Sequence, residues 1–399
     1  MLTRIEIENF KSIYKESIEL GRVNVFIGEN GCGKTNILEA VGMASARFQN
    51  KISNDELALK GIRVSKPSIT ISSFKGLKQK KHFYIKCHFK AKYDDFNLIL
   101  PFKMSPKSPD DIYSQWNDYA KSDYSEVNFA EVNKIIAKEV EQLVNEIKLQ
   151  KSNSSSQPAE PYIRQALLLR MTGYLPDFKM YTLSTEVLRG IGGRSFDIPG
   201  IHGENLDVLI ASLAKEEFSQ LIDHSHFISW LEEIVIDKEG TLRLQGHNLN
   251  LSQSKLYFRD KFMAKKNNIF SAENANEGIL HILFYLALFI SKRTPKFFAI
   301  DNIETALNPQ LCRALMVELV KLAKKNDKQV LITTHNPAIL DGLNLHDDEV
   351  RLFIVERDFK GHTRVERLKI KPDAEVDGQR LKLSELWMRG YLGAIPQHF

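Results

Sequence analysis

The sequence has few cysteines and no long hydrophobic run. Its three cysteines, Cys32, Cys87 and Cys312, are scattered and form no CxxC pair, which excludes a small fold held together by disulfides. The most apolar stretch, residues 279–290, is too short to span a bilayer. The N-terminus is charged from Arg4 onward and lacks the apolar core of a signal peptide. We therefore expect a cytoplasmic protein without a membrane segment.

Neither sign of charge dominates the chain. Lys and Arg number 55 against 50 Asp and Glu, giving a formal net charge of +5 over 399 residues. This mild surplus permits contact with nucleic acid, but no concentrated basic stripe indicates it. A hydrophobic content of 43% excludes wholesale disorder and is ordinary for a globular protein. The length predicts two lobes, or one large domain with an insertion.

A glycine-rich segment interrupts this ordinary composition. Residues 28–35 read GENGCGKT and match the pattern GxxxxGK[ST], between an apolar run at 23–27 that predicts a strand and helical spacing over 36–47. In that context glycines let backbone N–H groups converge on phosphate oxygens at a helix N-terminus. Lys34 would contact the β- and γ-phosphates, and the Thr35 hydroxyl would bind Mg²⁺. The predicted nucleotide contacts are Asn30, Gly31, Cys32, Gly33, Lys34, Thr35 and Asn36.

Two apolar runs near the other end of the chain predict the remainder of this site. Residues 297–300 read FFAI and end at Asp301, so a buried strand would deliver a carboxylate to the phosphate end of the sheet, where it can hold Mg²⁺. Residues 330–334 form a second apolar run and are followed by His335. An imidazole there can donate a hydrogen bond to a phosphate at neutral pH.

Strand and helix patterns alternate at both ends of the chain and predict an α/β fold with a mixed sheet around the helix that follows the glycine loop. We expect residues 1–103 and 266–399 to build this unit and residues 104–265 to form an inserted, mainly helical lid. The spacing predicts a helix over 127–148 as an arm, or as a surface insertion without a partner. Helices are expected within 204–234, a short β return at 242–251, and a hairpin over 352–370.

The form G-x-N-G-x-G-K-T-N, with I-x-I-x-N-F-K-S upstream, resembles the ABC-type ATPase head. It is closer still to the bacterial AAA-like ATPases related to the overcoming-lysogenization-defect and SMC/RecF proteins. The resemblance extends over residues 2–47 and 270–342. The upstream motif consists of Ile5, Ile7, Asn9, Phe10, Lys11 and Ser12. The resemblance implies ATP and Mg²⁺ as cofactors and an N-terminal strand that helps to hold the nucleotide base.

The resemblance also assigns roles near Asp301. His335 would sense the γ-phosphate. The family pattern places a catalytic glutamate directly after the magnesium aspartate, where this chain has Asn302. Because an amide cannot accept a proton as a general base, hydrolysis is expected to be slow. Glu304, which matches the second acidic residue of the pattern, would polarise the water, or Asn302 would orient it.

A degenerate signature precedes the apolar helix at 279–290. ABC-type heads carry Ser-x-Gly here, and this chain has Asn276 and Gly278. In the resembled proteins this helix N-terminus faces the γ-phosphate of a second subunit. The alternative is an ordinary helix N-terminus. The signature implies a homodimer or higher oligomer, because the element cannot reach its own phosphate loop.

The resemblance implies a function as the sensor or regulatory subunit of a bacterial anti-phage system. Too few residues follow His335 for the nuclease domain of the resembled nucleases, so a separate effector protein, a nuclease or a toxin, is expected. Two alternatives remain open. One is a nucleotide-gated scaffold with very slow turnover. The other is a RecF-type repair ATPase that clamps DNA through Lys78, Lys80, Lys81, Lys265 and Lys266.

Overall fold

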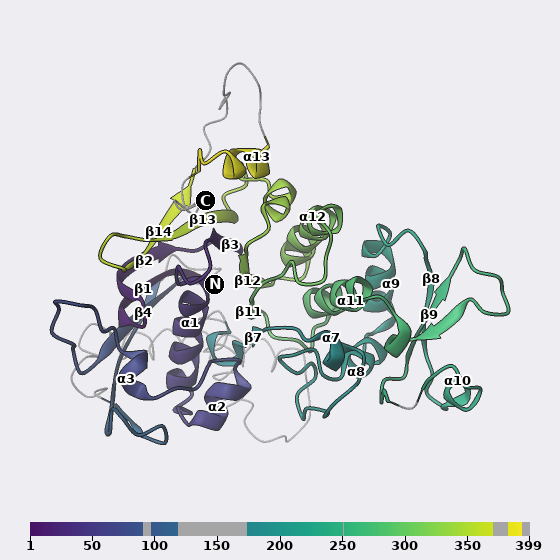
Figure 1. Cartoon of the computed structure of the whole chain (residues 1–399), viewed down its shortest axis with the longest axis horizontal. Coiled ribbons are helices and arrows are strands. Elements are labelled where there is room, and N and C mark those ends of the chain that lie inside the picture. Colours follow the sequence, from purple (N-terminus) through teal and green to yellow (C-terminus); the bar gives the residue numbers. More distant parts are fainter. Residues whose placement is uncertain (91–96, 119–173, 250, 370–381, 393–399) are drawn as a thin grey trace, which may run out of the picture.

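The computed structural model describes residues 1–90, 97–118, 174–249, 251–369 and 382–392 (Figure 1). The helix expected at 127–148 lies outside these ranges. Within them the chain folds into two sheets that enclose one helix, with further helices and a third, small sheet on the far side. The predicted α/β fold with a mixed sheet is confirmed.

The central sheet is mixed. In spatial order its strands are β14 (Thr363–Leu368), β13 (Val350–Arg357), β3 (Val23–Gly28), β12 (Gln329–Thr334), β11 (Phe297–Ile300) and β7 (Met180–Tyr181). Neighbours from β13 to β7 pair in parallel, and β14 pairs antiparallel with β13. Every residue of β3, β11 and β12 is buried, as expected for parallel strands covered on both faces. The closing hairpin predicted over 352–370 is confirmed.

Helix α1 (Lys34–Phe48) lies between the central sheet and a second, antiparallel sheet. The strands of the second sheet are β2 (Ile13–Glu19), β1 (Leu2–Phe10), β4 (Phe83–Lys90), β5 (Asn97–Pro106) and β6 (Trp116–Asp118). The alternation in β4 buries Phe83, Ile85 and Cys87 against α1, as a strand with one covered face requires. The helix after the glycine loop is thus enclosed by apolar side chains from both sheets.

Helices α11 (Glu277–Ile290) and α12 (Pro309–Lys325) cover the opposite face of the central sheet. Every residue of α11 after Glu277 is buried, which explains why it is apolar all round. Helix α12 begins with Asn308 as its cap, whose side chain accepts a hydrogen bond from the N–H of Leu311. No helix in the described ranges is both long and apolar enough to cross a membrane.

The segment expected to be helical between residues 204 and 234 contains strand as well. The third sheet consists of β8 (Leu231–Ile236), β9 (Leu256–Asp260) and β10 (Ile269–Ser271). The prediction of helix is wrong at residues 231–234, which belong to β8. The prediction of a short β segment over 242–251 is wrong at its start, where the chain forms α10 (Thr241–Leu244). The other helical elements are α2 (Asn54–Leu59), α3 (Pro67–Thr70), η2 (Leu175–Asp177), α7 (Thr185–Leu188), α8 (Leu206–Ala211), α9 (Lys215–His224), η3 (Ala272–Asn274), η4 (Pro337–Gly342) and α13 (Leu383–Met388).

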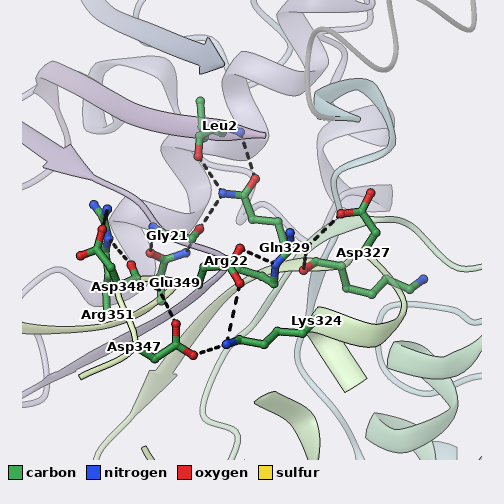
Figure 2. A network of polar contacts seen from close by, with 12 residues as sticks. Leu2, Gly21, Arg22, Lys324, Asp327, Gln329, Asp347, Asp348, Glu349 and Arg351 are labelled. Carbon is green, nitrogen blue, oxygen red and sulfur yellow. Dashed lines mark hydrogen bonds and ion pairs between the residues drawn. The ribbon is translucent and has the colours of Figure 1, made fainter. Parts of the chain in front are cut away.

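A buried amide joins the two large sheets (Figure 2). The Gln329 side chain donates to the carbonyls of Leu2 and Gly21 at 2.7 and 2.8 Å, and accepts from the Leu2 N–H at 3.1 Å. Nearby, Arg22 pairs with Asp327 at 3.0 Å and with Glu349 at 3.1 Å. These contacts fix β1 of the second sheet to β12 of the central sheet, and so fix the enclosure of α1.

Candidate nucleotide-binding site

The glycine loop connects β3 to α1 at the carboxyl edge of the central sheet. Gly33 precedes α1 with a φ of 112°, and a Cβ added there would lie 2.2 Å from Oγ1 of Thr363. Only glycine fits this position, since it adopts positive φ without strain and has no side chain to collide. The glycines of the motif therefore allow a tight turn that exposes backbone N–H groups at the start of a helix.

A chain of hydroxyl and amide groups holds this loop from the side. Thr363 Oγ1 donates to the Cys32 carbonyl at 2.7 Å and lies 2.7 Å from Oγ of Ser12. Ser12 Oγ in turn accepts from Nδ2 of Asn36 at 2.7 Å. Because Thr363 gives its proton to Cys32, the Ser12 hydroxyl donates to Thr363. Side chains from β14 and from the turn between β1 and β2 therefore hold the loop in this conformation through contacts within the protein.

Lys34 is the first residue of α1 and is 5% exposed. Its Nζ donates to the carbonyls of Gly28 and Glu29, each at 2.8 Å, and lies 3.2 Å from Nδ1 of His335. Burial lowers the pKa of Lys34, against the opposing pull of Asp301 and Glu304. The ammonium is thus held at the mouth of the loop, where a phosphate oxygen can replace a carbonyl as its partner.

Thr35 and Asp301 bring the oxygen atoms expected to hold a metal together. The Thr35 hydroxyl lies 3.1 Å from both carboxylate oxygens of Asp301, at the end of β11. The Thr333 hydroxyl donates to Oδ1 of the same carboxylate at 2.5 Å and accepts from the Asn302 N–H at 2.9 Å. A hydroxyl and a carboxylate side by side suit Mg²⁺, which prefers oxygen ligands. Sequence reasoning missed Thr333, which fixes the rotamer of Asp301.

The residues that follow Asp301 take different positions. The Asn302 backbone has a φ of 55°, a left-handed conformation that asparagine tolerates better than most residues. The Glu304 carboxylate accepts from the backbone N–H of His335 at 2.7 Å through Oε1. Its Oε2 is buried and has no hydrogen-bond partner among the described residues. Glu304 and His335 are therefore brought together with Lys34, and the Glu304 carboxylate retains one unused acceptor.

Asn276 and Gly278 lie at the start of α11. The Asn276 side chain accepts from the N–H of Ile279 at 3.0 Å and caps the helix. A Cβ added to Gly278 would lie 3.3 Å from the carbonyl of Ala306, in the loop that leaves the end of β11. The contacts described for these two residues are with α11 and this loop, which belong to other elements than residues 28–35. Their role toward a nucleotide remains a prediction.

A buried carboxylate on α1 supports the same edge of the site. Glu39 is fully buried and pairs with Lys11 at 2.6 Å and with Arg63 at 2.7 Å. Burial alone would raise the pKa of Glu39, but the hydrogen bonds and charges of its two partners outweigh burial and lower it. Arg63 also donates to Oδ1 of Asn36 at 3.1 Å. Sequence reasoning missed the cluster of Glu39, Lys11 and Arg63. The signal that could have revealed it is a carboxylate among the apolar positions of α1.

The remaining loop positions are less enclosed. Asn30 is exposed at the tip of the loop, and the Gly31 carbonyl accepts from Nε of Arg357 at 3.0 Å. Cys32 is buried, with its Sγ 3.8 Å from Nζ of Lys34, and burial raises the pKa of its thiol. The side chain of Asn36 contacts Ser12 and Arg63 as described. These positions line or brace the loop, and their predicted contacts with a nucleotide stay predictions.

Comparison with solved structures identifies the same fold. The chain is 14% identical to an SMC head described as "Crystal structure of the SmcHead bound to the C-winged helix domain of ScpA", with a TM-score of 0.56, covering 92% of this chain and 98% of the other. The SMC head domain from Thermotoga maritima gives 12% identity and a TM-score of 0.50, covering 92% of this chain and 99% of the other. At these identities the likeness concerns the fold alone.

Comparison at the level of sequence gives the family. No curated protein matches the chain. Residues 23–341, well over half of the sequence and including the glycine loop, Asp301 and His335, match the family described as "AAA domain, putative AbiEii toxin, Type IV TA system". The chain therefore belongs to this AAA domain family and is a P-loop ATPase with the fold of an SMC head.

Proposed function

We propose that the chain binds ATP with Mg²⁺ and hydrolyses it slowly. The observation that supports this most directly is the meeting of Lys34, Thr35 and Asp301 at one edge of the central sheet. The loop amides and the Lys34 ammonium would hold the phosphates, and the oxygens of Thr35 and Asp301 would hold the metal. Mg²⁺, when bound, neutralises charge that develops on the transferred phosphoryl group.

Three residues around this site would have different roles in hydrolysis. Glu304 would accept a hydrogen bond from the attacking water through Oε2, the acceptor for which the described residues supply no donor. His335 would donate to the γ-phosphate from its position beside Lys34. Asn302 lacks the basicity to serve in place of a glutamate. Because Glu304 is the one carboxylate proposed as a base at this edge, we expect slow hydrolysis of ATP.

We also propose that the active form is a dimer and acts as a switch. Asn276 and Gly278 at the N-terminus of α11 would face the nucleotide of a second copy. Such a dimer would be the sensor or regulatory subunit of a bacterial anti-phage system, holding or releasing a separate nuclease or toxin. The family description, which names a toxin and a toxin–antitoxin system, supports this direction.

A direct test combines turnover with mass. Phosphate release from Mg·ATP is measured for the wild type and for Lys34→Ala, and light scattering gives the mass of each with and without nucleotide. We expect slow release and an ATP-dependent doubling of mass in the wild type alone. Co-expression with the products of neighbouring genes then tests for an effector. A monomer at saturating ATP would contradict the dimer, and no detectable release would favour the nucleotide-gated scaffold.

The DNA-clamp alternative receives less support from the structure. The segment that carries Lys78, Lys80 and Lys81 lies between α3 and β4, while Lys265 and Lys266 lie between β9 and β10, at opposite ends of the molecule (Figure 1). Lys80 also pairs with Glu8 at 3.1 Å. One protomer therefore does not gather these lysines into a single patch. Salt-sensitive, ATP-dependent binding of duplex DNA would nevertheless revive this alternative.

A further inference from the structure

A cavity separate from the nucleotide site lies at the opposite edge of the central sheet. It has a volume of about 640 Å³ and is lined by the C-terminal end of α1, by α2, by β7 and by the segment between α11 and β11. Lys34 begins α1 and Asp301 follows β11, whereas Gln49 after α1 and Lys296 before β11 line the cavity. The cavity and the nucleotide site therefore lie at opposite ends of the same helix and the same strand.

The wall of this cavity is strongly basic. Three carboxylates line it, Glu56, Asp177 and Asp197. Twice as many cationic side chains do so, namely Lys51, Lys60, Lys179, Lys292, Arg293 and Lys296. A surplus of this size at one cavity stands out against a net charge of +5 for the whole chain. A concave site with one sign of charge concentrates the field and attracts ions of the opposite sign.

The carboxylates neutralise only part of this charge. Lys179 pairs with Asp197 at 2.7 Å, and Lys51 lies 3.6 Å from Glu56. No ion pair between a described carboxylate and the side chain of Lys292, Arg293 or Lys296 occurs in the structure. Lys296 instead lies over the ring of Tyr174, 4.9 Å from its centroid. Three cations thus keep their charge at the mouth of the cavity.

Two buried donors lie deeper in the same wall. Lys60 is 6% exposed, and its Nζ donates to Oγ of Ser45 and to the carbonyl of Pro176 at 2.9 and 2.8 Å. The Tyr181 side chain is fully buried, and its hydroxyl has no hydrogen-bond partner among the described residues. Burial, reinforced by Lys179, lowers the pKa of Lys60 to about 8, which a bound anion would reverse.

We propose that this cavity binds a small phosphate-bearing anion with two or more negative charges, separately from the nucleotide held at Lys34. Its volume falls within the range of about 300–1,000 Å³ typical of small-molecule sites, large enough for a diphosphate or a mononucleotide. Arg293, Lys292 and Lys296 at the mouth of the cavity attract the ligand and pair with its charges.

The test uses the full chain with Lys34→Ala, which removes the phosphate-binding amine of the glycine loop. Sodium pyrophosphate and adenosine monophosphate are titrated separately into this protein by calorimetry, in low salt without Mg²⁺. We expect saturable binding of one pyrophosphate per chain. Adding Arg293→Glu weakens it by about tenfold or more. A comparison of the two titrants distinguishes an inorganic diphosphate from a nucleotide as the better ligand.

Two further variants serve as controls. Lys238→Glu makes the same charge change at an exposed residue between β8 and α10, and affinity stays unchanged. Tyr181→Phe removes a fully buried hydroxyl that has no partner among the described residues, so the fold and the affinity for pyrophosphate both stay unchanged. Binding that is absent, or equally strong after Arg293→Glu, overturns the proposal. Uptake of a twenty-nucleotide single strand with steep salt dependence, but not of pyrophosphate, replaces it with a nucleic-acid site. None of these readings depends on ATP turnover.

Discussion

The backbone N–H of His335 donates a 2.7 Å hydrogen bond to the carboxylate of Glu304. The two residues are separated by 31 positions and follow adjacent parallel strands, β12 and β11. One oxygen of Glu304 thereby accepts from the protein, while the other is buried and has no partner in the part of the chain that the structure describes. This contact holds the carboxylate beside His335, and it supports the proposal that Glu304 acts as the base for a water molecule.

The first prediction concerns Glu304→Gln. The amide can still accept from His335, so the loop should keep its shape, but it cannot take a proton from water. We expect kcat for ATP hydrolysis to fall by about a hundredfold or more, while the affinity for Mg·ATP changes little. Steady-state phosphate release and calorimetry measure the two quantities. Wild-type turnover in this variant would remove Glu304 from the mechanism.

Asn302→Glu gives a second prediction. Restoring the glutamate of the related pattern would be expected to accelerate hydrolysis, but the backbone at this residue has a φ of 55°. A glutamate in the left-handed region costs about 1 kcal/mol of stability relative to asparagine. We expect a lower unfolding free energy together with a higher kcat. Asn302→Gly, which accepts this conformation, is the matched control and should keep wild-type stability. An unchanged kcat for Asn302→Glu would show that the missing glutamate does not account for slow turnover.

Much of the central sheet and its helices follow from the sequence alone. The strands at β3, β11 and β12 were predictable because continuous apolar runs adjoin a phosphate motif and a carboxylate. Strand β8 was not, because Leu231–Ile236 contains Glu232 and Glu233 and lacks clear alternation. Its conformation is set by pairing with Leu256–Asp260, a contact distant in sequence that local propensity does not report.

The candidate site, like the fold, could be predicted from the sequence only in part. The sequence predicts that Lys34, Thr35 and Asp301 lie close together, because each belongs to a motif whose residues have a known physical role. The brace between Ser12 and Thr363 joins residues 351 positions apart, and no local pattern marks either as a partner. Thr333 was equally hidden, since a threonine in a buried strand is ordinary. Supporting contacts of this kind depend on the assembled fold.

Lys60 provides a prediction about pH. Its pKa is lowered from 10.5 to about 8, chiefly by burial. Between these two pH values the unfolded chain holds a proton on Lys60 that the folded protein has released, so the free energy of unfolding rises with pH across this window. Lys60→Met lacks this contribution and should show a flatter dependence. Urea unfolding of both proteins at several pH values between about 8 and 10 in phosphate-free buffer measures the difference. Parallel pH profiles would contradict it.

A fourth prediction tests how the two large sheets are joined. Gln329→Leu removes two donated hydrogen bonds and one accepted bond at a buried position, and leaves the carbonyls of Leu2 and Gly21 without this partner. We expect a loss of about 2–4 kcal/mol in unfolding free energy. Lys321→Leu, at a side chain exposed on α12, serves as the surface control and should cost less than about 1 kcal/mol. Equal stabilities of the two variants would show that Figure 2 depicts a dispensable contact.

The most direct measurement is a calorimetric titration of Mg·ATP into the wild-type chain and into Lys34→Ala and Asp301→Ala. Saturable binding is predicted for the wild type. Loss of Lys34 should abolish uptake, whereas loss of Asp301 should remove the enhancement by Mg²⁺. Absence of nucleotide uptake by the wild type, or uptake unaffected by both substitutions, would contradict the placement of the nucleotide between these two residues.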